Sequence, residues 1–154
     1  MTTTKFRFVA LPSAIAEDAR RAASENRPDH RLVTVEEPHT APCRHCLEWA
    51  QPGERVILFP YHAVAVGRPY SESGPIFVHA ESCPRYEDQS YPSEFRQGRV
   101  FRAYDSEQNL IDARQLNGEQ PEAVIEKLFE NPDTAFVHAR SATHGCYTFG
   151  VERS

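Results

Sequence analysis

The chain has 154 residues, of which 40% are apolar and 25% are charged, so its size and composition are those of one soluble globular domain. Its formal net charge is −5. This acidic balance argues against nucleic acid and against an anionic membrane surface as partners, because both need clustered positive charge. No apolar run approaches the roughly 20 residues that span a bilayer, and the N-terminus lacks a long apolar segment with a cleavage site. We therefore expect a cytoplasmic protein with reduced thiols, and a homodimer is compatible with the sequence.

The predicted elements alternate between strands and helices along the chain. A helix is expected over residues 13–26, with Ser13 as its N-terminal cap. Another is expected over 119–130, where Val124, Ile125, Leu128 and Phe129 form one apolar stripe. Residues 43–50 are short and helix-compatible. Apolar patterning predicts strands over 5–10, 31–35, 55–59, 76–79, 99–105, 109–116, 134–140 and 146–152, the last four as two hairpins. This order predicts an α+β fold in a single domain, residues 1–154, with a mostly antiparallel sheet of about six or seven strands and two packed helices.

Three of the four cysteines lie in two short clusters that also contain histidine. Cys43 and Cys46 form a Cys-x-x-Cys pair, which can present two sulfurs to one ion from a turn or a helix start. His79 and Cys83 add a nitrogen and a sulfur from a strand end and its loop. Together the four residues would form a tetrahedral Cys₃His site for Zn²⁺, a common structural arrangement. Such a site requires sulfurs within about 4 Å of one another around a common centre.

Other interpretations of the thiols stay open. At a helix N-terminus, a Cys-x-x-Cys pair has a reactive first thiol, and Arg44 and His45 between the sulfurs would favour its thiolate further. The default interpretation is inert packing, because free cysteine is among the most buried residue types. Cys46 would then pack beside Trp49, and Cys146 would lie in the core through its strand. In the metal hypothesis, Cys146 or His45 could substitute for one of the four ligands.

A second group of side chains suggests an enzyme or a small-anion-binding protein. Three arginines and two histidines would converge on one cleft if the central strands are neighbours. The loop over residues 70–74 could cover this cleft. A thiolate from Cys43 or Cys146 would act with Arg44 as anion anchor and with His79 or His138 as acid or base. The ordinary alternative is solvent-facing arginines and a hydrogen-bonded core histidine; an interaction module without chemistry is a third hypothesis. The members of this group are Arg44, His79, Arg102, His138 and Arg140.

Several segments resemble a known family when taken together. They are Pro42–Arg44, Pro52–Val56, Ser73–His79, Arg102–Asp105 and Gly145–Cys146. In this order and spacing they are similar to the bacterial domain-of-unknown-function family numbered 1203, over about Pro42 to Arg153. The resemblance implies a small soluble bacterial protein and carries no activity with it. Its pattern rests on Cys43 and Arg44 more clearly than on Cys46, which favours a grouping of Cys43, Arg44, His79 and Cys146.

Overall fold

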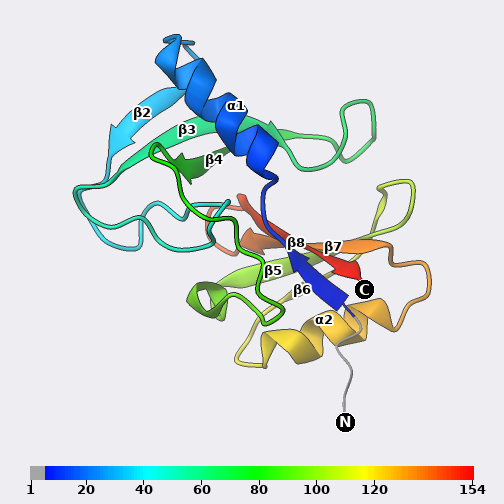
Figure 1. Ribbon diagram of the computed structural model, residues 1–154. Helices are drawn as coiled ribbons and strands as arrows, with labels where there is room; N and C mark the ends of the chain where they lie inside the picture. The colour runs from blue at the N-terminus through cyan, green and yellow to red at the C-terminus, as the bar shows by residue number, and fades with distance from the viewer. Residues whose placement is uncertain (1–5) are drawn as a thin grey trace. The chain divides into compact units, whose positions relative to one another are not determined.

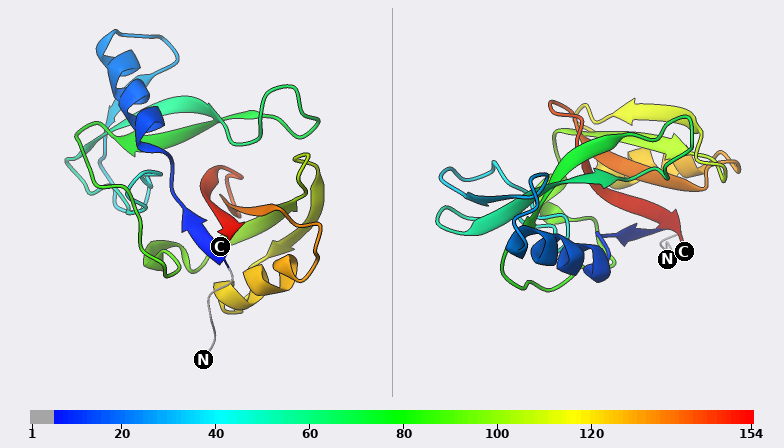
Figure 2. Two further views of the ribbon diagram at one scale, coloured as in Figure 1. Left: turned by 45° about the vertical axis from the view of Figure 1, so that its right-hand side comes forward. Right: turned by 90° about the horizontal axis from the view of Figure 1, so that it is seen from above.

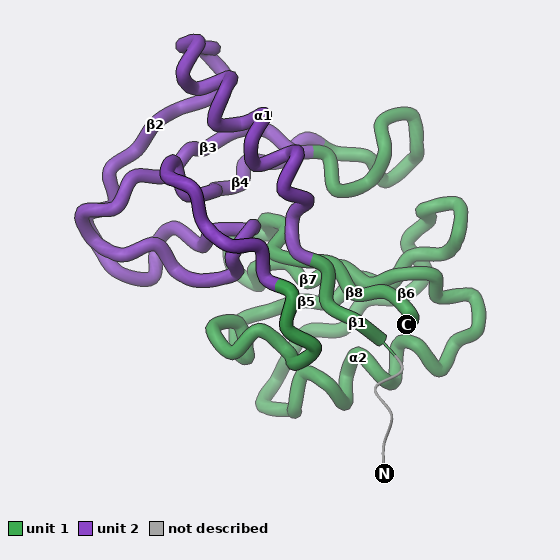
Figure 3. Tube along the Cα trace, in the orientation of Figure 1, with its two compact units in different colours: residues 1–9, 62–72, 87–154 green, residues 10–61, 73–86 purple. Residues whose placement is uncertain are grey.

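The computed structural model describes residues 6–154 (Figure 1). Two compact units are present (Figure 3): unit 1 comprises residues 6–9, 62–72 and 87–154, and unit 2 comprises residues 10–61 and 73–86. The α+β class is confirmed, with eight strands and two α-helices among the described residues. All eight predicted strands exist, although Lys5 lies outside the described residues. They divide between two sheets, of five and three strands, where the sequence suggested one. That the whole chain is a single domain stays a prediction.

Unit 1 is built on the five-stranded sheet. Its strands are β1 (Phe6–Val9), β5 (Arg99–Tyr104), β6 (Leu110–Gln115), β7 (Phe136–Ser141) and β8 (Tyr147–Arg153). They run in the order β1-β8-β7-β5-β6, and each pairs antiparallel with its neighbour. Both predicted hairpins are therefore confirmed. The strand that carries His138 lies at the centre, which places polar side chains in the middle of the sheet.

Aromatic rings fill the core of unit 1. The helix α2 (Pro121–Phe129) packs through Phe129, whose ring stacks on that of Phe6 with centroids 5.9 Å apart. Its buried residues include the predicted apolar stripe of Val124, Ile125 and Leu128. Phe8 contacts the ring edges of two further aromatic residues of the core, and a 3₁₀ helix over Ser93–Phe95 adds another buried ring.

Unit 2 contains the three-stranded sheet and the helix α1 (Ser13–Ser24). Its strands are β2 (Arg31–Thr34), β3 (Arg55–His62) and β4 (Ser73–His79), in the order β2-β3-β4. Figure 2 shows β3 and β4 as a long pair, with α1 beside them. The buried residues of α1 are alanines, so this helix lies close to its neighbours with little apolar surface. A small apolar cluster is formed by Val35, Ala41, Ala50 and Val56.

Two local predictions in unit 2 are wrong. Residues 43–50 form no helix; an isolated antiparallel bridge joins Pro42 to Trp49 around a tight turn. Ser13 is the first residue of α1 and not its cap, because its hydroxyl is engaged elsewhere and the capping position is Pro12, without a side-chain hydrogen bond. Within residues 6–154, no helix is long and apolar enough to cross a bilayer.

Candidate metal centre

The first two cysteines lie in a turn that the backbone closes tightly. The Cys43 N–H donates to the carbonyl of Glu48, and the Leu47 N–H donates to the carbonyl of Cys43, both at 2.9 Å. Leu47 has a φ of 57°, in the left-handed region that costs a residue other than glycine roughly 1–2 kcal/mol. Its side chain is only 2% exposed, so burial offsets this cost. The result is a rigid turn with Cys43 and Cys46 both buried.

Strand β4 brings the second pair of residues to this turn. Cys43 forms a parallel bridge with Phe77, and the Arg44 N–H donates to the Phe77 carbonyl at 3.0 Å. His79 follows two residues later, and its backbone N–H donates to the Cys43 Sγ at 3.3 Å. A short loop after His79 then places Cys83 beside Cys43. Backbone pairing thus produces the side-by-side arrangement of two segments nearly 40 residues apart.

The four candidate ligand atoms form a compact group. The Sγ atoms of Cys43, Cys46 and Cys83 and a ring nitrogen of His79 all lie within 4.8 Å of one another. The Cys43 and Cys83 sulfurs are 3.9 Å apart, and the Cys46 Sγ lies 3.5 Å from the His79 Nδ1. A tetrahedral zinc ion with ordinary bond lengths places two sulfurs about 3.8 Å apart and a sulfur and nitrogen about 3.5 Å apart. All four cysteines are free thiols, so a metal can engage them.

A carboxylate orients the candidate histidine ligand. The His79 Nε2 lies 3.3 Å from the Glu54 Oε1, and that oxygen also accepts the Gln51 backbone N–H. Because Nε2 faces a carboxylate, it keeps its proton, so a metal that displaces the second proton of this imidazole would meet the lone pair of Nδ1 on the side of the sulfurs. A carboxylate behind a ligating imidazole is the usual partner of histidine in metal sites.

Hydrogen-bond donors surround the sulfur of Cys83. The His45 Nδ1 lies 3.2 Å from this Sγ, and the His45 Nε2 lies 2.9 Å from the hydroxyl of Ser13. The Arg20 guanidinium donates to the same Sγ at 3.5 Å and, through Nε, to the His79 carbonyl at 3.0 Å. Ser13 and Arg20 both belong to α1, so this helix is attached to the cluster by two polar contacts.

The protonation of the cluster favours a bound cation. Hydrogen bonding to Cys46 and then to Cys83 lowers the pKa of the Cys43 thiol well below its usual range. The same contacts, first with Cys43, raise the pKa of Cys46, since one proton serves neighbouring sulfurs. Hydrogen bonding to Cys43 and Cys83 raises the pKa of His79 to about 11. The cluster therefore already stabilises a thiolate next to a positive charge, which a metal ion can replace.

The remaining predicted site residues do not gather at this centre. Arg44 is buried and its guanidinium donates to the Pro42 carbonyl at 2.7 Å. Cys146 belongs to unit 1 and is half-buried just before β8, so its predicted place in the core is wrong. No helix follows Cys43, so a helix dipole cannot make this thiol reactive as the redox interpretation required. His45 is not among the four ligand atoms but contacts one of them.

Arg102, His138 and Arg140 remain together inside unit 1. Arg102 of β5 and His138 of β7 are directly paired in register, and Arg140 lies two residues further along β7. Arg44 and His79 belong to unit 2. A single cleft formed by all five stays a prediction.

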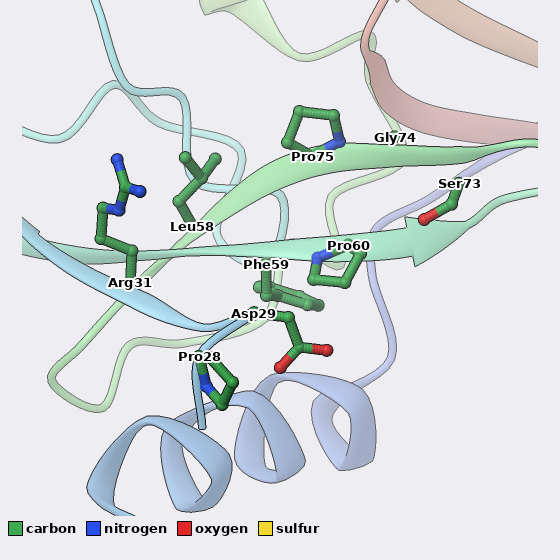
Figure 4. A pocket seen from close by; sticks show the side chains of 9 residues that line it. All are labelled: Pro28, Asp29, Arg31, Leu58, Phe59, Pro60, Ser73, Gly74 and Pro75. Carbon is green, nitrogen blue, oxygen red and sulfur yellow. The ribbon is translucent and has the colours of Figure 1, made fainter. Parts of the chain in front are cut away.

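A separate shallow groove of about 420 Å³ lies on unit 2 (Figure 4). Prolines and Phe59 form much of its wall, and Asp29 and Arg31 are its charged residues. It contains none of the thiols. With a proline-rich wall and no cluster of reactive groups, the groove has no evident chemistry.

One family model matches most of the chain. The model of a family described as a protein of unknown function (DUF1203) matches residues 40–153. The chain belongs to this family. The matched region contains all four residues of the thiol cluster, together with Arg102, His138 and Arg140, and begins after α1 and β2. Searches of curated proteins and of solved structures returned no significant match.

Sequence reasoning missed the residues that surround the four candidate ligands. Glu54 and Arg20 carry no motif, and their roles depend on contacts made only in the folded chain. Ser13 gave a misleading signal, because a serine after proline at a helix start is typical of a cap. His45, a substitute ligand in the sequence prediction, contacts the Cys83 sulfur and so has a supporting position.

Proposed function

We propose that Cys43, Cys46, His79 and Cys83 bind one Zn²⁺ and that this ion stabilises unit 2. The observation that carries the proposal is the spacing of the ligand atoms, 3.9 Å between two sulfurs and 3.5 Å between sulfur and nitrogen. These two separations match those expected around a tetrahedral zinc ion, and all four ligand atoms lie within 4.8 Å of one another. Three soft thiolates and one imidazole also select zinc over magnesium or calcium, which prefer oxygen ligands.

The ion would have a structural role in this site. The protein supplies all four ligands of a four-coordinate ion, so no position stays open for water or substrate. Catalytic zinc requires such an open position. Cys43 and Cys46 are buried, and the His79 side chain is only 13% exposed. The ligands come from the turn at Cys43, the end of β4 and the loop after it. Zinc would therefore join three segments of unit 2.

Neighbouring polar groups support the charge of such a centre. Zinc with three thiolates and a neutral imidazole has a net charge of −1. The guanidinium of Arg20 contacts one of the sulfurs and offsets this charge. Burial lowers the pKa of His45, so this imidazole is neutral and can donate from Nδ1 to the Cys83 thiolate while accepting from the Ser13 hydroxyl at Nε2.

Metal content and thiol reactivity of the purified, untagged protein test the proposal. Elemental analysis should find zinc at about one ion per chain, given four protein ligands for one ion. A thiol reagent added to the native protein should react readily with Cys146 alone, and all four cysteines should react after chelation and unfolding. Absence of stoichiometric zinc, together with four freely reacting thiols in the native state, would end the proposal.

The fourth cysteine provides a matched control. Cys46→Ala should abolish stoichiometric zinc, whereas Cys146→Ser should keep it, because Cys146 belongs to unit 1 and the ligand set does not include it. Substitution of Co²⁺ for zinc should give thiolate charge-transfer absorption in the parent and in Cys146→Ser. If one cysteine reacted much faster than the others at mildly acidic pH with no metal present, a thiol-dependent activity would be favoured instead.

A further inference from the structure

The centre of the five-stranded sheet in unit 1 carries two arginines with little negative charge to balance them. Arg140 is 4% exposed, and the side chain of Arg102 is 35% exposed. Both project from neighbouring strands: His138 pairs with Arg102 across β5 and β7, and Arg140 lies two residues beyond it on the same face. Buried guanidinium groups are costly unless they are paired and fully hydrogen-bonded, so their partners need to be accounted for.

One carboxylate serves both arginines. The Glu72 Oε1 accepts from the Arg140 NH1 at 2.6 Å, and the same oxygen lies 3.9 Å from the Arg102 NH1, beyond hydrogen-bonding distance. Arg140 also donates to the Gly145 carbonyl at 3.1 Å. Within residues 6–154, neither arginine has another ion pair. The two guanidinium groups thus retain an excess of one positive charge.

Two buried nitrogen atoms in this group, one on Arg140 and one on the neighbouring histidine, have no hydrogen-bond partner. They are the Nε of Arg140 and the Nδ1 of His138. His138 is 6% exposed and lies among the rings of Tyr104, Phe136 and Tyr147, with centroid distances of about 5 Å. Orphaned polar atoms on two neighbouring buried side chains are rare in folded proteins and call for an explanation, such as an absent ligand.

We propose that Arg102, His138 and Arg140 form a binding site for a small organic carboxylate, and that the Glu72 carboxylate occupies this site when the ligand is absent. The carboxylate class follows from Glu72 itself, since its Oε1 accepts a hydrogen bond from the Arg140 NH1 at 2.6 Å. The planar fork of arginine binds carboxylates in a bidentate manner, which Glu72 does not achieve with either guanidinium. The Glu72 side chain is 57% exposed, so it can leave for solvent while an external carboxylate takes its place.

Isothermal titration of the full-length, metal-loaded protein with acetate and with benzoate tests this site. Glu72→Gln removes the internal competitor, so this variant should bind these carboxylates at least about tenfold more tightly. The reason is that the Glu72 carboxylate occupies the site in most molecules of the parent protein. Adding Arg102→Gln to this variant should abolish the gain. Arg102 is partly exposed, so its replacement should leave the fold intact.

Arg114→Gln is the matched control. Arg114 lies on β6 of the same sheet, is paired with Phe101 in register and so belongs to the opposite face from Arg102. Its replacement should leave carboxylate binding unchanged. Equal affinity of the parent and Glu72→Gln would overturn the proposal, as would binding that survives the loss of Arg102. Tighter binding of inorganic phosphate alone would also overturn it, because the site would then select oxyanions and not carboxylates.

Discussion

The imidazole of His79 is held at both ring nitrogens, and this decides how it can act. Nε2 faces Glu54 at 3.3 Å, while Nδ1 faces the Cys46 sulfur at 3.5 Å. A histidine that is free to choose its tautomer loses part of its affinity for a metal, because only one nitrogen points correctly. The carboxylate removes that choice and raises the basicity of the ligating nitrogen.

Glu54→Gln should therefore weaken zinc binding by about 10–100-fold, the usual effect of losing a partner behind a ligand. Glutamine keeps an oxygen for the Gln51 N–H but removes the charge next to the imidazole. Equilibrium competition with a chromophoric chelator measures the affinity. Glu81→Gln is the control, since Glu81 pairs with Arg55 and contacts none of the four ligands. An unchanged affinity in Glu54→Gln would mean that Glu54 has no orienting role.

At the scale of elements, strands β5 and β7 combine an apolar face with a polar one. Phe101, Ala103, Val137 and Ala139 are fully buried, and the residues between them include the arginines and His138. Burial, and then the charges of Arg140 and Arg102, lower the pKa of His138 to about 3. This histidine is therefore neutral in the folded protein at physiological pH.

The neutral His138 should make the protein sensitive to acid. A histidine in an unfolded chain has a pKa of about 6.5, so between this value and about 3 only the unfolded state binds the proton. The free energy of unfolding should fall as pH decreases through this window, by at most about 1.4 kcal/mol per pH unit. Denaturant unfolding of the parent and of His138→Gln between about pH 7 and about pH 5 measures it. The variant should show the shallower dependence; parallel curves would contradict the assignment, because zinc loss affects both proteins equally.

Local patterns were sufficient to predict most elements. The stripe of Val124, Ile125 and Leu128 predicted α2, and alternation predicted the two hairpins. Residues 43–50 were misjudged because a helix was compatible with their local composition, whereas the observed turn needs Leu47 at positive φ and backbone bonds to β4. The division into two sheets depends on which strands pair over long distances, and alternation within one strand carries no such information.

The candidate site was predictable to a similar degree. Ligand type and the Cys-x-x-Cys spacing were enough to select Cys43, Cys46, His79 and Cys83. What could not be predicted was the set of contacts around them, because a carboxylate or a guanidinium becomes a supporting residue only through its place in the fold. The structure assigns the five residues of the one-cleft hypothesis to two different units, a division that local sequence patterns do not reveal.

At the scale of the whole molecule, the two units differ in what stabilises them. Unit 1 has a large aromatic core and a five-stranded sheet that contains two paired hairpins. Unit 2 has a three-stranded sheet and an alanine-rich helix, and its buried apolar residues are mostly alanine and aliphatic side chains, with Phe59 as a buried ring. Small cores supply little net stability, and natural domains often add a metal in such cases. The thiol cluster lies in the unit that has the smaller apolar core.

Under the proposed function, removal of zinc should loosen unit 2 selectively. Hydrogen exchange followed by mass spectrometry, before and after chelation, should show faster exchange in residues 41–50 and 77–86 by about tenfold or more, because local opening there no longer breaks metal bonds. Strands β5, β7 and β8 should keep their protection, since unit 1 supplies none of the four ligands. Cys146→Ser, treated in the same way, should reproduce this pattern. Equal loosening of both units would show that the ion stabilises the chain as one cooperative body, and unchanged exchange in residues 41–50 would remove the structural role of the site.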